Sequence, residues 1–90
     1  MGTALIKIKL MPTSVDVDLE AMKTNAEKAI SETGGEKCTF EEEAVAFGLK
    51  AVIAGFALDE EKSLDTVEEK LKTVENVNSV QVIDMRRAFG

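Results

Sequence analysis

The order of strand-like and helix-like segments along this 90-residue chain constrains its fold more than any single residue does. The first segment, residues 3–11, alternates apolar and polar side chains, as a strand with one buried face does. Its apolar side carries Ala4, Ile6, Ile8 and Leu10, and its polar side carries Lys7 and Lys9. Pro12 follows, and because proline has no backbone N–H to donate, we expect the strand to end there.

Two further stretches have the periodicity of amphipathic helices. Asp16 or Asp18 offers an N-terminal cap for the first helix, and the pair Gly34-Gly35 is expected to end it. Ser63 offers the cap of the second helix. In each helix the apolar residues fall within an arc of about 100° at helical pitch. They are Leu19, Met22, Ala26, Ala29 and Ile30 in the first helix and Leu64, Val67, Leu71 and Val74 in the second.

Three more segments have the character of strands. Residues 36–43 alternate weakly, which predicts a partly exposed strand at a sheet edge. Residues 49–58 are apolar at almost every position, as in a central strand that is covered on both faces. A strand that is apolar at nearly every position does not show which of its residues face the core. The sequence therefore does not settle whether Val52, Ala54 and Phe56 lie on the lysine-bearing face. The last strand is predicted at residues 79–85 and is followed by a short basic tail.

The predicted order is therefore strand, helix, strand, strand, helix, strand. It is the order of the ferredoxin-like α+β fold, a βαββαβ sandwich with a four-stranded antiparallel sheet and two helices on one face. The crossover connections are right-handed in nearly all proteins, which places both helices on the same side. We expect residues 1–90 to form one domain, because so short a chain has no room for a second core. The other sheet face is then left to solvent, a second copy or a partner.

The absence of histidine and the presence of a single cysteine, Cys38, exclude several reaction classes. Ser-His-Asp and Cys–His catalysis both need an imidazole, and zinc sites draw mainly on histidine and cysteine. A single cysteine cannot form a disulfide within the chain. We expect Cys38 to be a half-buried strand thiol, because free cysteines are usually buried.

The charge balance argues against nucleic-acid binding, and the apolar pattern argues against a membrane span. Seventeen acidic residues against eleven basic ones give a net charge of −6, which repels a phosphate backbone. The four aromatic residues are all phenylalanine, which leaves little for base stacking. No apolar run approaches the length of a membrane span, and no secretory signal is visible, so we expect a cytoplasmic location. The acidic excess can steer the chain toward a basic patch on a protein partner.

Two short motifs are candidates for a functional site. In the segment AFGLK at residues 46–50, Gly48 permits an unusual turn that leaves Phe47 either in the core or exposed at a loop tip. The pair Arg86-Arg87 is either a frayed basic tail or a site for carboxylate or phosphate groups. The acidic runs at residues 41–43 and 59–61 lack the spacing of a calcium loop, and we interpret them as solvated surface.

Taken over its full length, the chain resembles archaeal elongation factor 1-beta and, more distantly, the carboxyl-terminal exchange domain of the eukaryotic counterpart. The resemblance rests on the order and spacing of five stretches and not on any one of them. They are IKIKLMP, VDVDLEAM, AFGLKA, LDTVEEKL and VNSVQVIDMRR.

The resemblance implies a guanine nucleotide exchange factor for elongation factor 1-alpha, a GTPase whose switch and magnesium region the factor distorts without covalent chemistry. It implies no bound cofactor in this chain, because the magnesium and the nucleotide belong to the partner. The partner contacts implied by the resemblance are Phe47, Gly48, Lys50, Arg86, Arg87 and Phe89. The eukaryotic relatives carry a near-terminal lysine, and Phe89-Gly90 stands at that place here. Arg86 or Arg87 is then the candidate for the missing positive charge.

The fold class alone leaves other functions open. The main alternative is a domain that senses a small molecule. An acylphosphatase-like hydrolase is disfavoured, because Met11-Pro12-Thr13-Ser14 stands where a phosphate-cradling loop is needed. An RNA-binding sheet is the weakest alternative, because the central strands lack surface aromatics. The oligomeric state does not follow from the sequence.

Overall fold

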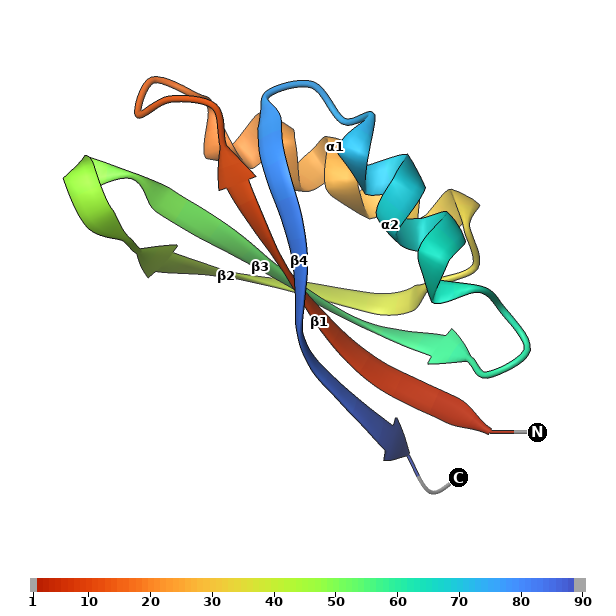
Figure 1. Cartoon of the computed structure of the whole chain (residues 1–90). Helices are drawn as coiled ribbons and strands as arrows, with labels where there is room; N and C mark the ends of the chain where they lie inside the picture. The colour runs from red at the N-terminus through yellow and green to blue at the C-terminus, as the bar shows by residue number, and fades with distance from the viewer. Residues whose placement is uncertain (1, 89–90) are drawn as a thin grey trace.

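A computed structural model of the chain describes residues 2–88 and has the predicted βαββαβ order (Figure 1). The elements are β1 (Thr3–Pro12), α1 (Leu19–Glu32), β2 (Glu36–Ala44), the 3-10 turn η1 (Ala46–Gly48), β3 (Lys50–Asp59), α2 (Leu64–Lys72) and β4 (Val77–Ala88). The ferredoxin-like α+β class is confirmed.

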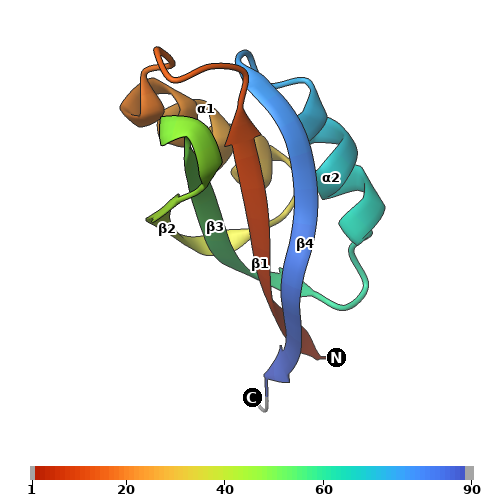
Figure 2. The ribbon, with the colours of Figure 1, turned by 60° about the vertical axis from the view of Figure 1, so that its left-hand side comes forward.

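The four strands form one antiparallel sheet in the order β2-β3-β1-β4. Both helices lie on the same face of this sheet, and both termini lie at the end opposite the β2–β3 connection (Figures 1 and 2). As predicted, β2 is an edge strand and β3 is an interior strand. We call the face without helices the open face.

Side chains from β1, β3 and the two helices meet between the layers and form the core. Its fully buried members with the largest volumes are Ile6, Ile8, Leu10, Met22, Ile30, Leu71, Val52 and Val67. The pairing of β1 with β3 decides which β3 residues face the helices, a question that the sequence left open. Val52 lies opposite Leu10, and Phe56 lies opposite Ile6, on the helix face. The lysine-bearing face of β1 is therefore the open face.

The prediction that β3 is covered on both faces is wrong. Both helices pack on one side, and on the open face Ile53, Gly55 and Ala57 are only partly buried. Apart from Ile53, the open-face side chains of β3 are small, so the strand looks apolar throughout although only one face lies under a helix. The lack of alternation in the sequence reflects this mostly small-residue open face and not a second covering layer.

Both helices begin at residues that the sequence predicted as N-terminal caps. The Asp18 carboxylate, and not that of Asp16, accepts hydrogen bonds from the backbone N–H groups of Glu20 at 3.0 Å and Ala21 at 3.3 Å. The Ser63 hydroxyl accepts one from the N–H of Thr66 at 3.4 Å. Helix α2 ends at Lys72, one residue before its C-cap, so Val74 lies beyond the helix although it still packs against the core.

The last strand is longer than predicted, and there is no frayed basic tail at Arg86 and Arg87. Strand β4 continues to Ala88, because the first residues of β1 offer it partners: Leu5 lies opposite Arg86 and Ala4 opposite Arg87. One extra residue, Ile83, interrupts this pairing as a β-bulge. Because side chains alternate along a strand, the bulge decides which β4 residues beyond it face the helices.

Candidate docking surfaces at the two ends of the sheet

The connection between β2 and β3 is a tight turn that is closed by its own backbone. The N–H of Val45 donates to the carbonyl of Leu49 at 2.9 Å, and the N–H of Leu49 donates to the carbonyl of Ala46 at 3.3 Å. Inside the turn, Phe47 has a φ of 62° and Gly48 a φ of 78°, so two successive residues are left-handed. Glycine adopts this conformation without steric cost, whereas a phenylalanine there costs about 1–2 kcal/mol. The turn is a specific structure that fixes where Phe47 projects.

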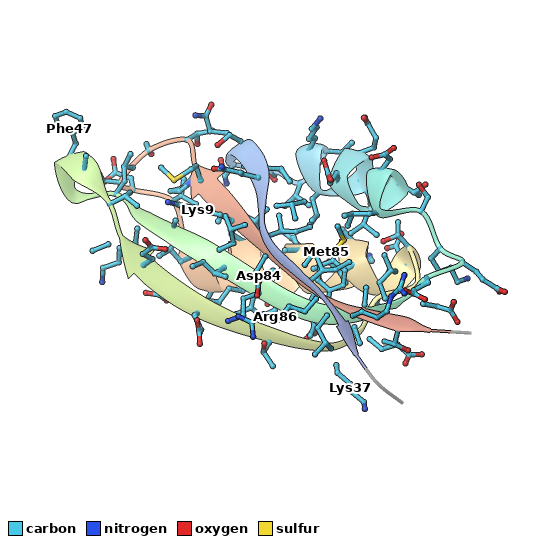
Figure 3. All side chains as sticks on the ribbon, turned by 60° about the horizontal axis from the view of Figure 1, so that its bottom comes forward. Lys9, Lys37, Phe47, Asp84, Met85 and Arg86 are labelled. Atoms are coloured by element: carbon cyan, nitrogen blue, oxygen red, sulfur yellow. The ribbon has the colours of Figure 1, made fainter. Side chains whose placement is uncertain are left out.

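Phe47 is 94% exposed, the most of any large apolar residue in the described chain. Its ring points away from the sheet at the tip (Figure 3). The core alternative for Phe47 is thus wrong, because the left-handed turn carries its side chain past the end of both strands. Leaving such a ring in water forgoes about 1.5–3 kcal/mol of transfer free energy, which a partner with an apolar pocket can recover.

A second apolar side chain accompanies the tip, and sequence reasoning missed it. Val15, in the loop between β1 and α1, is 61% exposed. Its Cγ1 lies 3.9 Å from where a Cβ on Gly48 would stand. Between this loop and the tip is a hollow of about 260 Å³ that Pro12, Val17 and Lys50 also line. An apolar residue between Ser14 and Asp16, in a loop whose other apolar residue, Val17, packs against the core, was the signal in the sequence.

Lys50 begins β3 at the base of the tip, on the same sheet face as the helices, and is exposed. The base is braced by an ion pair in which Lys23 Nζ, on α1, donates to Glu42 Oε2 at 2.7 Å. That hydrogen bond lowers the pKa of Glu42 and raises the pKa of Lys23, and the charge of Lys50 lowers the pKa of Glu42 by a smaller amount. The tip therefore combines an exposed ring with the nearby cation of Lys50.

Arg86 and Arg87 lie at the other end of the sheet and on opposite faces of it. Arg86 is on the open face, where its Nε is 3.1 Å from Asp84 Oδ2. Arg87 is on the helix side, where its Nε is 2.6 Å from Glu60 Oε2. Neighbours in sequence thus do not act as one basic pair, because successive side chains of a strand point in opposite directions.

The structure therefore divides the predicted site residues into two groups. It brings Phe47, Gly48 and Lys50 together at the tip, whereas Arg86 and Arg87 pair with Leu5 and Ala4 toward the other end of the sheet, in a molecule that is 41 Å long. Figure 3 shows Phe47 and Arg86 well apart. Phe89 lies outside the described residues. We call the first group the tip and the second the arginine end.

Other features of the described chain concern ligands and membranes. Cys38 is half-buried, as predicted, and burial raises the pKa of its thiol to about 11. Within residues 2–88 no three side chains of the metal-ligating types gather into a cation site. Neither helix in that range has the length and apolar character needed to cross a bilayer.

Comparison with known proteins assigns the chain to a family. The sequence model of the EF-1 guanine nucleotide exchange domain matches residues 5–88. Elongation factor 1-beta of Methanothermobacter thermautotrophicus is 42% identical, over 97% of this chain and 98% of that protein. The protein of the same name from Methanosarcina barkeri is 40% identical, over 97% and 99%. That from Methanococcus maripaludis strain C7 is 37% identical, over 94% and 97%. As its sequence motifs predicted, the chain belongs to the archaeal elongation factor 1-beta family.

Proposed function

We propose that this protein is a cytoplasmic translation factor that promotes exchange of GDP for GTP on elongation factor 1-alpha. The observation that supports this most is the tip, where a constrained turn holds Phe47 almost fully exposed. The chain that carries this tip matches the EF-1 guanine nucleotide exchange domain. An exposed aromatic ring on a pre-organised turn is the kind of group that anchors a protein interface.

Exchange needs no covalent step by this chain. The factor binds the nucleotide-free GTPase more tightly than the GDP-bound form, and this difference in affinity drives the release of GDP. By thermodynamic reciprocity, GDP weakens the binding of the factor by the same ratio. The ring of Phe47 contributes to this difference if its pocket on the GTPase is open only when GDP has left.

The partner is expected to contact both ends of the sheet. Because the tip and the arginine end are separated along a 41 Å molecule, one GTPase that touches both must extend along its long axis. At the arginine end, the guanidinium groups of Arg86 and Arg87 bring positive charge toward the switch and magnesium region. Each is held by a carboxylate of its own chain, so the partner's anionic groups have to compete with Asp84 and Glu60.

Release of a fluorescent GDP from the cognate archaeal elongation factor 1-alpha tests the proposed function directly. With unlabelled nucleotide in excess, we expect the release rate to rise with the concentration of this protein and to reach a plateau. Circular dichroism of the same preparation establishes that the factor is folded. A folded factor that leaves the release rate unchanged at all concentrations would rule out the exchange function.

Replacing Arg86 and Arg87 together by alanine should slow the stimulated release of GDP. The loss of two charge-assisted contacts is expected to reduce stimulation roughly tenfold, which corresponds to about 1.4 kcal/mol. Both side chains are largely exposed, and surface ion pairs stabilise a fold only slightly, so the variant should remain folded.

Lys28→Ala provides the matched control for this change, because Lys28 is an exposed cation on α1, away from both ends. Combined with a change at the tip, the arginine changes should have an additive effect on the free energy, since distant sites act independently. Stimulation that equals that of the unaltered protein would remove the arginine end from the interface.

A further inference from the structure

The open face of the sheet contains a hollow with a volume of about 330 Å³, and Arg86 is the one residue of its lining that the proposed exchange function uses. Its floor is formed by Gly55 and Ala57 of β3, and its rim by Lys7, Lys37, Asp84 and Arg86. These rim residues come from three strands, β1, β2 and β4. The volume is at the lower end of the range for sites that bind small molecules, about 300–1,000 Å³.

The depth of the hollow depends on a missing side chain. Gly55 lies opposite Lys7 on β1 and opposite Thr39 on β2. A Cβ at Gly55 would stand 2.9 Å from Thr39 Oγ1, closer than side-chain atoms normally approach. Glycine in the interior of a strand lowers β propensity, and one use of it is to let another group approach the backbone.

Two irregularities of the sheet place cations around this floor. The bulge at Ile83 in β4 shifts the alternation, so that Asp84 and Arg86 lie opposite Lys7 and Leu5 on the open face. A second irregularity, in β2, holds Lys37 with a φ of 55°, which is unusual for a residue other than glycine. Backbone strain of this kind often occurs at functional sites.

The charge of the hollow is opposite to that of the whole chain. Three cations and one carboxylate leave two positive charges at the rim, in a protein whose net charge is −6. The ion pair with Asp84 engages Nε of Arg86, one of the three nitrogens of the guanidinium, and holds that group beside Asp84 (Figure 3). Both residues line the hollow. A site of this charge favours an anion, and guanidinium and ammonium groups together suit phosphate oxygens.

We propose that the open-face hollow binds the phosphate group of a small organic phosphate. The two uncompensated positive charges match the double negative charge of a phosphate monoester. The side chain of Leu5, which is 49% exposed, and that of Ala57 on the floor give the organic part an apolar surface. A second copy of the chain is a poorer occupant, because it would bring the same cationic rim against this one.

Titration of the isotope-labelled protein, followed by amide chemical shifts, tests this assignment without the GTPase, so its outcome is independent of the exchange assay. The probes are phenyl phosphate, inorganic phosphate and benzoate. We expect saturable shifts at Thr39, Gly55 and Ala57, with phenyl phosphate binding more tightly than either of the other two. Shifts that do not saturate, or equal affinity for benzoate, would overturn the assignment.

Three variants distinguish specific binding of phenyl phosphate in the hollow from nonspecific attraction of this anion to surface lysines. Lys7→Gln and Lys37→Asn should each weaken phenyl phosphate binding roughly tenfold, as the loss of one charge-assisted hydrogen bond does. Asparagine tolerates the left-handed backbone of Lys37, so that variant should keep its melting temperature. Lys28→Gln, on α1, should bind as the unaltered protein does. If Lys28→Gln weakens binding as much as the rim variants do, the hollow is not the site.

Discussion

Replacement of Phe47 by alanine is expected to remove most of the stimulation of GDP release at low factor concentration. The concentration needed for half-maximal stimulation should rise roughly thirtyfold, which corresponds to the loss of about 2 kcal/mol at an aromatic hot spot. The reason is the expected difference in burial: the ring is 94% exposed in the free protein, and we expect the complex to bury it. The measurement is the rate of release as a function of factor concentration.

The same substitution should leave the fold intact. Alanine and phenylalanine both carry a Cβ, so the strain of the left-handed turn is the same in both and the comparison isolates the ring. Ile83→Ala is the matched control, because Ile83 is also an exposed apolar residue, 42% exposed, but lies in β4 and not at the tip. An unchanged concentration dependence for Phe47→Ala would show that the tip does not dock.

Much of the fold could be predicted because the local periodicity of apolar residues indicates which side chains are buried. The alternation in β1 separated Ile6 and Ile8 from Lys7 and Lys9 without reference to any partner strand. In the structure the isoleucines lie on one face of the sheet and the lysines on the other, as expected. Likewise Asp18 and Ser63 cap their helices because a short polar side chain satisfies N–H groups only a few residues away. Such features depend on neighbours in sequence.

The errors arose where a distant segment decides the structure. The length of β4 depends on the first residues of β1, which pair with Arg86 and Arg87 although they lie at the other end of the chain. The faces of β3 depend on where the helices pack, and small residues such as Gly55 conceal the open side. A strand that is apolar throughout gives no local signal of either.

For the candidate site, the sequence supplied candidate residues but not their arrangement. Family resemblance made Phe47 and the two arginines candidates, whereas their separation follows from sheet topology, because the β2–β3 turn and the end of β4 lie at opposite ends of the sheet. The exposure of Phe47 follows from two left-handed residues in succession, and only Gly48 gave a hint of it in the sequence. Val15 joins the tip through space alone.

Replacement of Leu71 by alanine is expected to have the largest effect on stability. Leu71 is fully buried on α2, and truncation of a buried leucine costs about 3–5 kcal/mol, which includes the cavity that is left. Total stability for a chain of 90 residues is about 5–13 kcal/mol. One substitution therefore removes a large part of it. Urea unfolding followed by circular dichroism measures the difference.

Leu64→Ala is the matched control, because Leu64 is the same residue type on the same helix but is only half-buried. We expect it to cost about 1 kcal/mol, in proportion to the smaller apolar area that it removes from water. Equal losses for the two variants would contradict a core centred under α2.

At a temperature where the Leu71→Ala protein is still folded, its stimulation of GDP release should match that of the unaltered chain, since Leu71 lies in the core and belongs to neither docking end. Phe47→Ala should show the reverse pattern, with stability kept and stimulation lost, because the ring at the tip contributes almost nothing to the core.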